Sequence, residues 1–516
     1  MNGAEALVRT LLASGVDSCF ANPGTSEMHF VAALDQFPAM RAVPCLSEGV
    51  VTGAADGYGR MTDQPAATLL HCGPGLANGI ANLHNAARAY TPMVNLVGDQ
   101  ATYHAPLDPP LASDIESLSR PFAHWFRNSR SAAAVGADAA QAVAAAMTGA
   151  RGVAVLGLPS DTCWDEGGAE AAPVPAGAPE QVAQEAVARA AQLLLAPGDK
   201  VLMVGGPVLR AGPLALAAAI AARSGARLFT PPQIARMERG AGRPVATRLP
   251  YPVDAACAAL SGAQSLVLLG CNRPVSFFAY PGKPGRPEPA GCTVHSLAAP
   301  AEDALQALER LAAALGVDAP LPPPPLQRLS LPDCAGQPIT PETVAAVVAA
   351  LLPEGAVVVD EAISFGRAFF PATGTAAPHD WLQLTGGAIG SGLPMAAGAA
   401  VAAPGRRVVA LQADGSAMYT VQALWTQARE ALDVTTVILS NRRYAILDGE
   451  LQNVGAKPGP SSDRLFGLDR PGIGWTVLAA SLGVDAARAE TLAGFADLFA
   501  AANRRRGPFL IELVIP

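Results

Sequence analysis

The 516-residue chain has few charged side chains, few aromatic ones and no excess of basic residues. Charged residues make up 15% and aromatic residues 5%, while half of all residues are hydrophobic. The formal net charge is −8. Because nucleic-acid binding needs a basic face, this charge argues against a nucleic-acid partner. Low charge with high hydrophobicity also excludes a disordered chain, and the length predicts several packed domains.

Cysteine motifs and long apolar runs are missing as well. The eight cysteines are scattered with no Cys-x-x-Cys pair, so we expect reduced thiols and neither a zinc site nor a disulfide framework. No apolar run reaches the roughly 18 residues that span a bilayer, and no charged-then-apolar signal segment opens the chain. Instead, Asn2 and Glu5 form a capping-box pattern for a first helix that Gly15 can end. We therefore expect a cytoplasmic protein with no membrane partner.

Short runs rich in Val, Ile and Leu alternate with longer Ala-rich helical patterns along the whole chain. Each run is followed by Gly, Asp or Asn and then by a helical pattern, which is typical of buried strands in parallel sheets. The runs predict strands at residues 153–158, 200–204, 265–269, 356–359, 407–411 and 435–439. This pattern indicates an α/β fold with mainly parallel sheets flanked by helices.

Two proline-rich stretches interrupt the alternation, at residues 166–179 and 319–339. Four prolines follow one another at 322–325, and such composition is typical of semi-rigid linkers. The two stretches divide the chain into segments 1–165, 180–318 and 340–516, each of a size suited to one α/β domain. We expect three domains, each with its own central sheet.

The strongest chemical motif lies in the last third. Asp414 follows the predicted strand 407–411, and Asn441 follows the strand 435–439. The spacing leaves room for one strand–helix–strand unit, so both side chains are expected at the carboxyl ends of neighbouring strands, where open α/β sheets bind ligands. Their oxygens suit Mg²⁺ bridging a diphosphate, whose oxygens the N–H groups of Gly415 and Ser416 can bind. An ordinary turn Asp and Asn in a βαβ unit is the alternative.

This motif resembles the metal–diphosphate signature of thiamine-diphosphate enzymes. The resemblance implies that Asp414, Asn441 and the backbone oxygen of Arg443 bind the metal, while Ala413 and Ser440 depart from the usual Gly and Asn. It extends over nearly the whole chain and is closest to benzoylformate decarboxylase and to acetolactate synthase large-subunit homologues. It therefore implies three domains, a pyrimidine-binding, a middle and a diphosphate-binding one, with thiamine diphosphate and Mg²⁺ as cofactors.

Segments of the first third match the same family. Glu48 follows a strand-like run at 43–46 and matches the carboxyl that contacts the cofactor's aminopyrimidine. That role needs an apolar pocket that raises the carboxyl's proton affinity. Thr25, in the segment 22–27, matches a substrate-binding position, and His71, before Gly-Pro-Gly, matches a catalytic histidine. The alternatives are a Glu that caps the next helix and a structural histidine.

Other positions are assigned by the resemblance alone. Ile389 would hold the two cofactor rings in a bent shape, although simple core packing is its alternative, and the backbone oxygen of Gly387 would accept from the cofactor's amine. Ala279 replaces a second active-site histidine of benzoylformate decarboxylase, which counts against benzoylformate as the substrate. The remaining assignments are cofactor contacts at Ser364, Gly415, Ser416 and Tyr444 and substrate contacts at Ile446 and Glu450.

The resemblance implies an enzyme that cleaves or forms a carbon–carbon bond next to a carbonyl. We expect non-oxidative decarboxylation of a 2-oxo acid, with an acetolactate-synthase-type carboligase and a non-catalytic cofactor-binding homologue as alternatives. A nicotinamide or flavin oxidoreductase is a third, but residues 204–207 do not fit Gly-x-Gly-x-x-Gly, and we expect no FAD. The family further implies a homodimer or homotetramer in which Glu48 of one chain meets the Asp414–Asn441 site of another.

Overall fold

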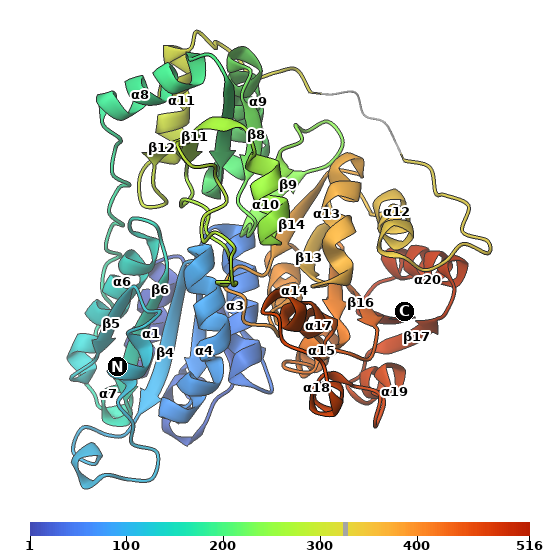
Figure 1. Ribbon diagram of the computed structural model, residues 1–516. Coiled ribbons are helices and arrows are strands. Elements are labelled where there is room, and N and C mark those ends of the chain that lie inside the picture. Colours follow the sequence, from blue (N-terminus) through green and yellow to red (C-terminus); the bar gives the residue numbers. More distant parts are fainter. Residues whose placement is uncertain (324–328) are drawn as a thin grey trace.

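The computed structural model describes residues 1–323 and 329–516, which form three sheets covered by helices (Figure 1). The first sheet has six parallel strands in the order β2-β1-β3-β4-β6-β5. Its strands are β1 (Ser18–Ala21), β2 (Arg41–Pro44), β3 (Ala66–Leu70), β4 (Met93–Asp99), β5 (Trp125–Asn128) and β6 (Val153–Pro159). Its helices are α1 (Gly3–Ala13), α2 (Met28–Leu34), α3 (Glu48–Thr62), α4 (Cys72–Ala89), α5 (Ile115–Ser119), α6 (Ala132–Met147) and α7 (Ser160–Trp164).

The second sheet has five parallel strands in the order β10-β8-β7-β11-β12. These are β7 (Asp199–Val204), β8 (Arg227–Thr230), β10 (Thr247–Arg248), β11 (Ala263–Leu269) and β12 (Thr293–Ala298). The helices of this part are α8 (Gln184–Leu195), α9 (Ala211–Ser224), α10 (Val253–Leu260) and α11 (Ala304–Ala314).

The third sheet has seven strands in the order β17-β18-β16-β15-β13-β14-β9. Its strands are β9 (Arg236–Arg239), β13 (Val357–Glu361), β14 (His379–Gln383), β15 (Val408–Ala413), β16 (Val434–Ser440), β17 (Asp485–Ala489) and β18 (Phe509–Val514). Its helices are α12 (Pro341–Leu351), α13 (Phe369–Ala372), α14 (Gly392–Ala402), α15 (Asp414–Ala417), α16 (Ala423–Arg429), α17 (Ala445–Asn453), α18 (Pro460–Phe466), α19 (Trp475–Ser481) and α20 (Leu492–Arg504).

Strand β9 comes from the middle of the chain yet pairs with the third sheet, where it lies beside β14 (Figure 1). It runs antiparallel to β14, with Met237 opposite Trp381. Its residues alternate between full and partial burial, as expected for an edge strand of an otherwise parallel sheet. The predicted middle segment 180–318 therefore shares one strand with the C-terminal sheet.

The α/β fold with mainly parallel sheets is confirmed, and all six strands predicted from apolar runs are present within two residues at each end. The predicted capping box is also present, since the N–H of Glu5 donates to Oδ1 of Asn2 at 2.9 Å. Residues 167–179 and the described parts of 319–339 contain no helix or strand, while 324–328 of that predicted linker lie outside the described residues. The domain boundaries stay a prediction.

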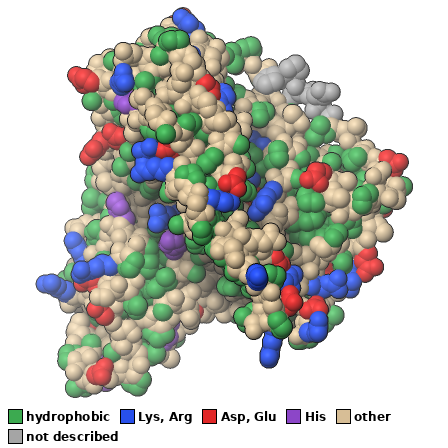
Figure 2. Space-filling view, viewed as in Figure 1, with side chains coloured by type: hydrophobic (Ala, Val, Ile, Leu, Met, Phe, Trp, Pro, Cys, Tyr) green, Lys and Arg blue, Asp and Glu red, His purple; other side chains and the backbone are tan. Residues whose placement is uncertain are grey.

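The outer surface carries charges of both signs. On the face shown in Figure 2, Lys and Arg side chains are interspersed with Asp and Glu, and hydrophobic side chains lie between them. None of the described helices combines the length and the apolarity needed to cross a bilayer.

Helices α3 and α14 join the first and third sheets. Buried residues of both helices belong to one hydrophobic core, among them Val51 and Ala54 of α3 and Leu393 and Ala397 of α14. Small side chains let the helices approach closely. Because α3 begins at Glu48, this packing fixes the position of Glu48 relative to the loop that precedes α14.

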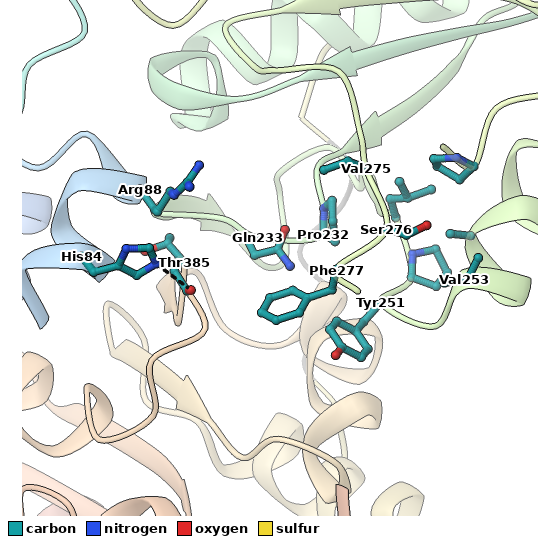
Figure 3. A pocket seen from close by; sticks show the side chains of 15 residues that line it. His84, Arg88, Pro232, Gln233, Tyr251, Val253, Val275, Ser276, Phe277 and Thr385 are labelled. Carbon is teal, nitrogen blue, oxygen red and sulfur yellow. Dashed lines mark hydrogen bonds between the residues drawn. The ribbon is translucent and has the colours of Figure 1, made fainter. Parts of the chain in front are cut away.

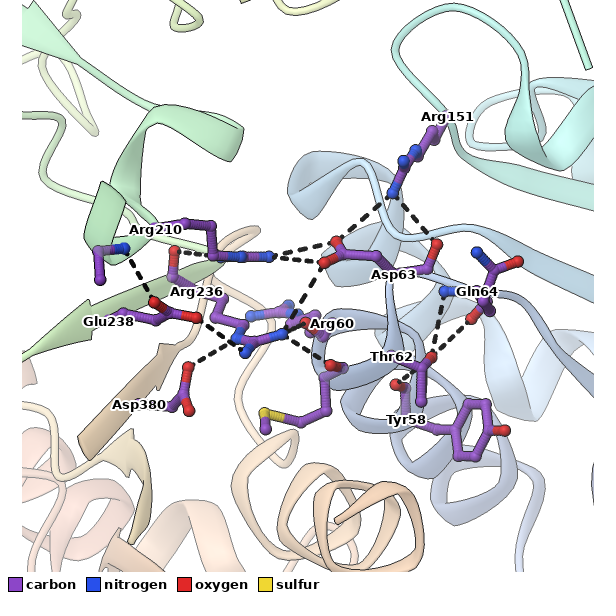
Figure 4. Close-up of polar contacts among 12 residues, drawn as sticks. Tyr58, Arg60, Thr62, Asp63, Gln64, Arg151, Arg210, Arg236, Glu238 and Asp380 are labelled. Carbon is purple, nitrogen blue, oxygen red and sulfur yellow. Dashed lines mark hydrogen bonds and ion pairs between the residues drawn. The ribbon is translucent and has the colours of Figure 1, made fainter. Parts of the chain in front are cut away.

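A polar junction connects all three sheets. Asp63, after α3, forms ion pairs with Arg151 and Arg210, and Arg236 of β9 donates to Asp380 of β14 at 2.7 Å (Figure 4). Arg60 of α3 forms a buried ion pair with Asp56 and also donates to the backbone oxygen of Gln383 in β14 of the third sheet. These contacts hold the N-terminal, middle and C-terminal parts together.

Replacing Arg60 by Ala is expected to destabilise the protein by about 3–5 kcal/mol, because it leaves a carboxylate buried without its cation. Arg60 donates to both oxygens of Asp56, at 2.8 and 2.6 Å, and to the backbone oxygen of Gln383 at 2.6 Å. Denaturant unfolding of the intact chain measures the effect. Arg120→Ala, which breaks an exposed i,i+4 pair with Glu116, is the control and should cost under about 1 kcal/mol. Equal effects of the two changes would contradict the prediction.

Candidate active site

The third sheet opens into a cavity at the carboxyl ends of its central strands. The segments that follow β13, β15, β16 and β18 all contribute to its walls, as does the loop before α14. Adjacent parallel strands end at one edge of a sheet, so residues far apart in sequence meet there. The predicted site residues that line this cavity are Ser364, Ile389, Asp414, Gly415, Ser416, Asn441, Arg443, Tyr444 and Ile446.

Asp414 is a buried carboxylate, 2% exposed, at the end of β15. One oxygen accepts from the N–H of Gly415 at 2.8 Å and the other from the N–H of Arg442 at 2.6 Å. Burial raises the pKa of Asp414, and these hydrogen bonds partly oppose the rise. A nearby cation favours the charged form of such a group. Asn441 lies at the end of the neighbouring strand β16, so the carboxylate and amide oxygens offer the donor set that Mg²⁺ prefers.

Glu361, which the sequence analysis did not single out, supports the loop that carries Ile389. Its carboxylate accepts from the N–H groups of Gly390 and Gly392, at 2.7 and 2.6 Å, and from the side chain of Gln412 at 3.0 Å. The same Gln412 amide donates to Ser416. Burial raises the pKa of Glu361, while these donors favour its charged form. Glu361 thus ties the Ile389 loop to the Asp414 segment.

Replacing Glu361 by Gln is expected to destabilise the fold by about 1–3 kcal/mol. The Gln side chain has one acceptor oxygen where the carboxylate has two, so its NH₂ group would face a backbone N–H donor, and that buried donor would lose its acceptor. We also expect weaker cofactor binding, since the loop that carries Ile389 loses its anchor. Denaturant unfolding and titration with the cofactor measure the two effects. Glu354→Gln, at an exposed position before β13, should change neither.

The residues predicted in the first third lie at the carboxyl edge of the first sheet. Thr25, Glu48 and His71 follow β1, β2 and β3, which are neighbours in that sheet. Glu48 is 8% exposed and accepts from the side-chain amide of Asn78 at 3.2 Å. It occupies the first turn of α3, so a favourable interaction with the helix N-terminus and a chemical role are both compatible with its position. Thr25 is exposed.

The ring of His71 is held by a buried acid that the sequence analysis did not assign. Its Nδ1 lies 3.0 Å from Oε2 of Glu27 and 3.2 Å from Oγ of Ser26. Glu27 is itself fixed, because it accepts from the N–H of Gly24 at 2.7 Å and from the hydroxyl of Ser26. A Cβ at Gly24 would lie 2.2 Å from Cγ of His71, so only glycine lets the ring lie there. With Nδ1 engaged, Nε2 is the ring atom left for a ligand.

Beside His71, the thiol of Cys72 is neutral at ordinary pH. Burial raises its pKa to about 11, and the nearby carboxylates of Glu27 and Asp99 act in the same direction, against the effect of a hydrogen bond with Ser26. A neutral buried thiol is a poor nucleophile. His71 is therefore the better candidate for proton transfer at this edge.

Comparisons with known proteins match both ends of the chain. Residues 1–127 match the family described as thiamine pyrophosphate enzyme, N-terminal TPP binding domain, and residues 367–513 match the corresponding C-terminal TPP binding domain. A Mycobacterium tuberculosis protein named as an acetolactate synthase large subunit, IlvX, is 50% identical over 518 residues, covering 100% of this chain and 99% of that protein. The chain belongs to the thiamine pyrophosphate enzyme family. It is a thiamine-diphosphate-dependent enzyme.

Two further relatives match this chain over nearly its whole length. Benzoylformate decarboxylase of Pseudomonas aeruginosa is 31% identical over 534 residues, covering 97% of this chain and 96% of the relative. The solved structure of a thiamine diphosphate-dependent 4-hydroxybenzoylformate decarboxylase from Rhodococcus jostii RHA1 superposes with a TM-score of 0.84 at 25% identity, covering 100% of this chain and 99% of that one. The enzyme is thus decarboxylase-like or acetolactate-synthase-like.

Within this thiamine pyrophosphate enzyme chain, the predicted site residues fall in both matched domains, and the side-chain amide of Asn82 links them by donating to the backbone oxygens of Gly49 and Gly390. The predicted site residues that line the Asp414 cavity fall in the matched C-terminal domain, except for Ser364, while Thr25, Glu48 and His71 fall in the matched N-terminal domain. Of the described residues, those that line the Asp414 cavity include none of these three. Gly387 and Glu450 also lie outside its lining and instead contact residues of the middle segment.

A second cavity of about 320 Å³ lies where the three parts of the enzyme meet (Figure 3). His84 and Arg88 of α4 lie on one side, and Tyr251 and Phe277 of the middle segment on the other. Nε2 of His84 lies 3.1 Å from the backbone oxygen of Gly386. Gly386 precedes Gly387, so this cavity borders the predicted cofactor loop from the side of the middle segment.

Proposed function

We propose that the enzyme catalyses the non-oxidative decarboxylation of a 2-oxo acid, with thiamine diphosphate and Mg²⁺ bound at the Asp414 cavity. The observation that carries this proposal is the meeting of Asp414, Asn441, Ser364 and Ile389 around one cavity at the carboxyl edge of the third sheet. The likeness to benzoylformate decarboxylase over nearly the full length supports the decarboxylase assignment.

The residues of the cavity fit the cofactor and its metal. Asp414, Asn441 and the backbone oxygen of Arg443 would hold Mg²⁺, while Ile389 and, from outside the cavity lining, the backbone oxygen of Gly387 would orient the cofactor rings. Bound thiamine diphosphate supplies the electron sink for the electron pair that remains when the carboxylate leaves. Ser364, Gly415, Ser416 and Tyr444, which line the cavity, would contact the diphosphate side of the cofactor.

The chain's own acid–base groups move the protons. Glu48 exchanges a proton with the aminopyrimidine ring, a role that its burial beside Asn78 supports. His71, with Nδ1 engaged by Glu27, uses Nε2 to exchange a proton with the substrate. Thr25, Ile446 and Glu450 surround the substrate.

We propose that each active site forms between two copies of the chain, with Glu48 of one copy and Asp414 of the other. Exposed apolar side chains flank both groups and suit an interface: Leu46 is 49% exposed, and Met418 and Tyr419 are 40% and 58% exposed. A homodimer is the smallest assembly that satisfies this arrangement, and a homotetramer would contain two such pairs.

Mixing two inactive variants tests the shared site. When Glu48→Gln and Asp414→Ala chains are unfolded together and refolded, random pairing makes half of the dimers mixed. Each mixed dimer has one site with both residues intact, so about a quarter of the wild-type activity is expected. If both residues served the same chain, every site would lack one of them, and the mixture would stay inactive.

Product analysis tests the reaction. The purified enzyme, loaded with thiamine diphosphate and Mg²⁺, is given pyruvate, benzoylformate or a longer 2-oxo acid, and aldehydes and acyloins are measured. Release of CO₂ and an aldehyde supports the proposal. Acetolactate-synthase-type carboligation is the second candidate because of the 50% identity to IlvX, and an acyloin without free aldehyde would favour it. Removal of the metal by EDTA should stop either reaction.

A further inference from the structure

Helix α17 carries a carboxylate toward the substrate side of the Asp414 cavity. The helix begins directly after the loop of Asn441 and Tyr444, and Ile446 in its first turn lines the cavity. Glu450 lies four residues after Ile446, and residues at this spacing share one face of a helix. Glu450 therefore lies one turn from the cavity wall, on the same side of α17.

A tyrosine of the middle segment holds Glu450 in place. The hydroxyl of Tyr280 donates to Oε2 of Glu450 at 2.7 Å. Burial and the Glu450 carboxylate raise the pKa of Tyr280, so the phenol keeps its proton and remains the donor. This hydrogen bond joins α17, which has no fully buried residue, to the middle segment.

The same segment reaches the predicted cofactor loop. The ring of Phe277, three residues before Tyr280, packs on Gly387, where a Cβ would lie 2.4 Å from Cζ of the ring. Gly387 has a φ of +84°, which also favours glycine. The segment from Phe277 to Tyr280 therefore contacts both the predicted cofactor loop, at Gly387, and helix α17, at Glu450.

The Glu450 carboxylate has capacity for a further donor. Among the described residues, Tyr280 is its side-chain donor, and no Lys, Arg or His lies within ion-pair distance of it. A carboxylate accepts several hydrogen bonds, so Oε1 remains available. The negative charge also repels the carboxylate of a 2-oxo acid, so that end of the substrate must point away from α17. The opposite end of the substrate then faces Glu450.

We propose that Glu450, positioned by Tyr280, selects 2-oxo acids whose far end carries a hydrogen-bond donor and disfavours those that end in a hydrocarbon or a carboxylate. This inference rests on the proposed 2-oxo acid decarboxylase function. The expected preference is about 10- to 100-fold in kcat/KM, the size of one hydrogen bond to a charged acceptor.

Two matched substrate series test the inference on the holoenzyme. One consists of benzoylformates with a para methyl, hydroxyl or carboxyl group, and the other of 2-oxopentanoate, 4-hydroxy-2-oxobutanoate and 2-oxoglutarate. In any series that is turned over, the hydroxyl compound should exceed its methyl counterpart by at least about 10-fold, and the dicarboxylate should be slowest. Turnover of the methyl compound at the same kcat/KM would overturn the inference.

Three variants test whether Glu450 causes the preference for the hydroxyl compound over the methyl compound. Glu450→Leu should reverse the order of methyl and hydroxyl compounds, and Tyr280→Phe should raise KM for the hydroxyl compound with little change in kcat. Glu309→Gln, at an exposed position of α11, is the control and should keep the wild-type order. An unchanged preference in Glu450→Leu would contradict the assignment. If the wild-type enzyme consumed no 2-oxo acid at all, the proposed function itself would be wrong and the inference would fall with it.

Discussion

Replacing Glu48 by Gln is expected to lower kcat for 2-oxo acid turnover by about 10²- to 10⁴-fold, the usual contribution of one positioned acid–base group. Gln preserves the size of the side chain and can still bind Asn78, but it does not ionise. The buried position at the start of α3 excludes bulk water from the carboxyl, so no solvent base replaces it easily. Steady-state kinetics with saturating cofactor measure the change.

The fold and the cofactor site of this variant should remain intact. Cofactor affinity is expected to change by less than about 10-fold, because Asp414 and Asn441 are untouched and a neutral acceptor replaces the carboxylate. Glu116→Gln, at an exposed position of α5, is the control and should retain full activity. Wild-type turnover by Glu48→Gln would show that Glu48 has only a helix-capping role.

Replacing Asp414 by Ala is expected to weaken Mg²⁺-dependent binding of thiamine diphosphate by at least about 100-fold and to abolish turnover. Loss of a residue that only hydrogen-bonds to a metal-coordinating side chain costs about 10- to 100-fold in metal affinity. The loss of Asp414 should cost more, because Asp414 is placed to coordinate the metal directly. Isothermal titration of the variant with cofactor and Mg²⁺ measures the loss. Asp485→Ala, at the exposed start of β17 in the same sheet, should bind like the wild type.

The pH dependence of binding provides a second test of Asp414. Burial raises the pKa of this carboxyl in the metal-free protein, and a metal binds only the deprotonated form. Protonation therefore competes with Mg²⁺, and the cofactor affinity should fall as the pH is lowered through the raised pKa. Below that pKa the decrease approaches about 10-fold per pH unit, one proton for each metal bound. Affinity that does not depend on pH would contradict a role for Asp414 as a metal ligand.

The strand ends that carry Asp414 and Asn441 could be predicted because buried parallel strands have a local signature, a short apolar run followed by a polar turn. The parallel pairing of β15 with β16 confirms that the two residues follow neighbouring strands, although two helices, α15 and α16, connect these strands where one was expected. Their assignment as metal ligands stays a prediction, as do the roles of Glu48 and His71.

Residues that position other site residues could not be predicted from such strand-end patterns. Glu361 holds a backbone loop and Glu27 holds the ring of His71, and nothing in the local sequence of Glu27 distinguishes it from an ordinary acidic residue. Glu361 did have one signal, since it ends a strand next to that of Asp414. Tyr280 follows Ala279 directly, but its contact with Glu450 joins positions 170 residues apart, and only the packing of the middle segment on α17 brings them together.

The pairing of β9 with the third sheet could not be predicted from the sequence either. Its four residues have no long apolar run, and the pairing with β14 depends on how the middle segment packs on the last one. Local patterns indicate which residues can form a strand, whereas the partner of a short edge strand is determined by tertiary contacts.

Because β9 comes from the middle segment, a fragment that contains only the C-terminal part of the enzyme would lack one strand of its sheet. A fragment that starts at residue 340 would retain every wall of the Asp414 cavity and still lack β9, which would bare the hydrogen-bonding groups of β14 around Trp381. Uncovered edges of this kind recruit strands from other molecules and lead to aggregation. The cofactor-binding half should therefore be obtainable in soluble form only together with residues 236–239.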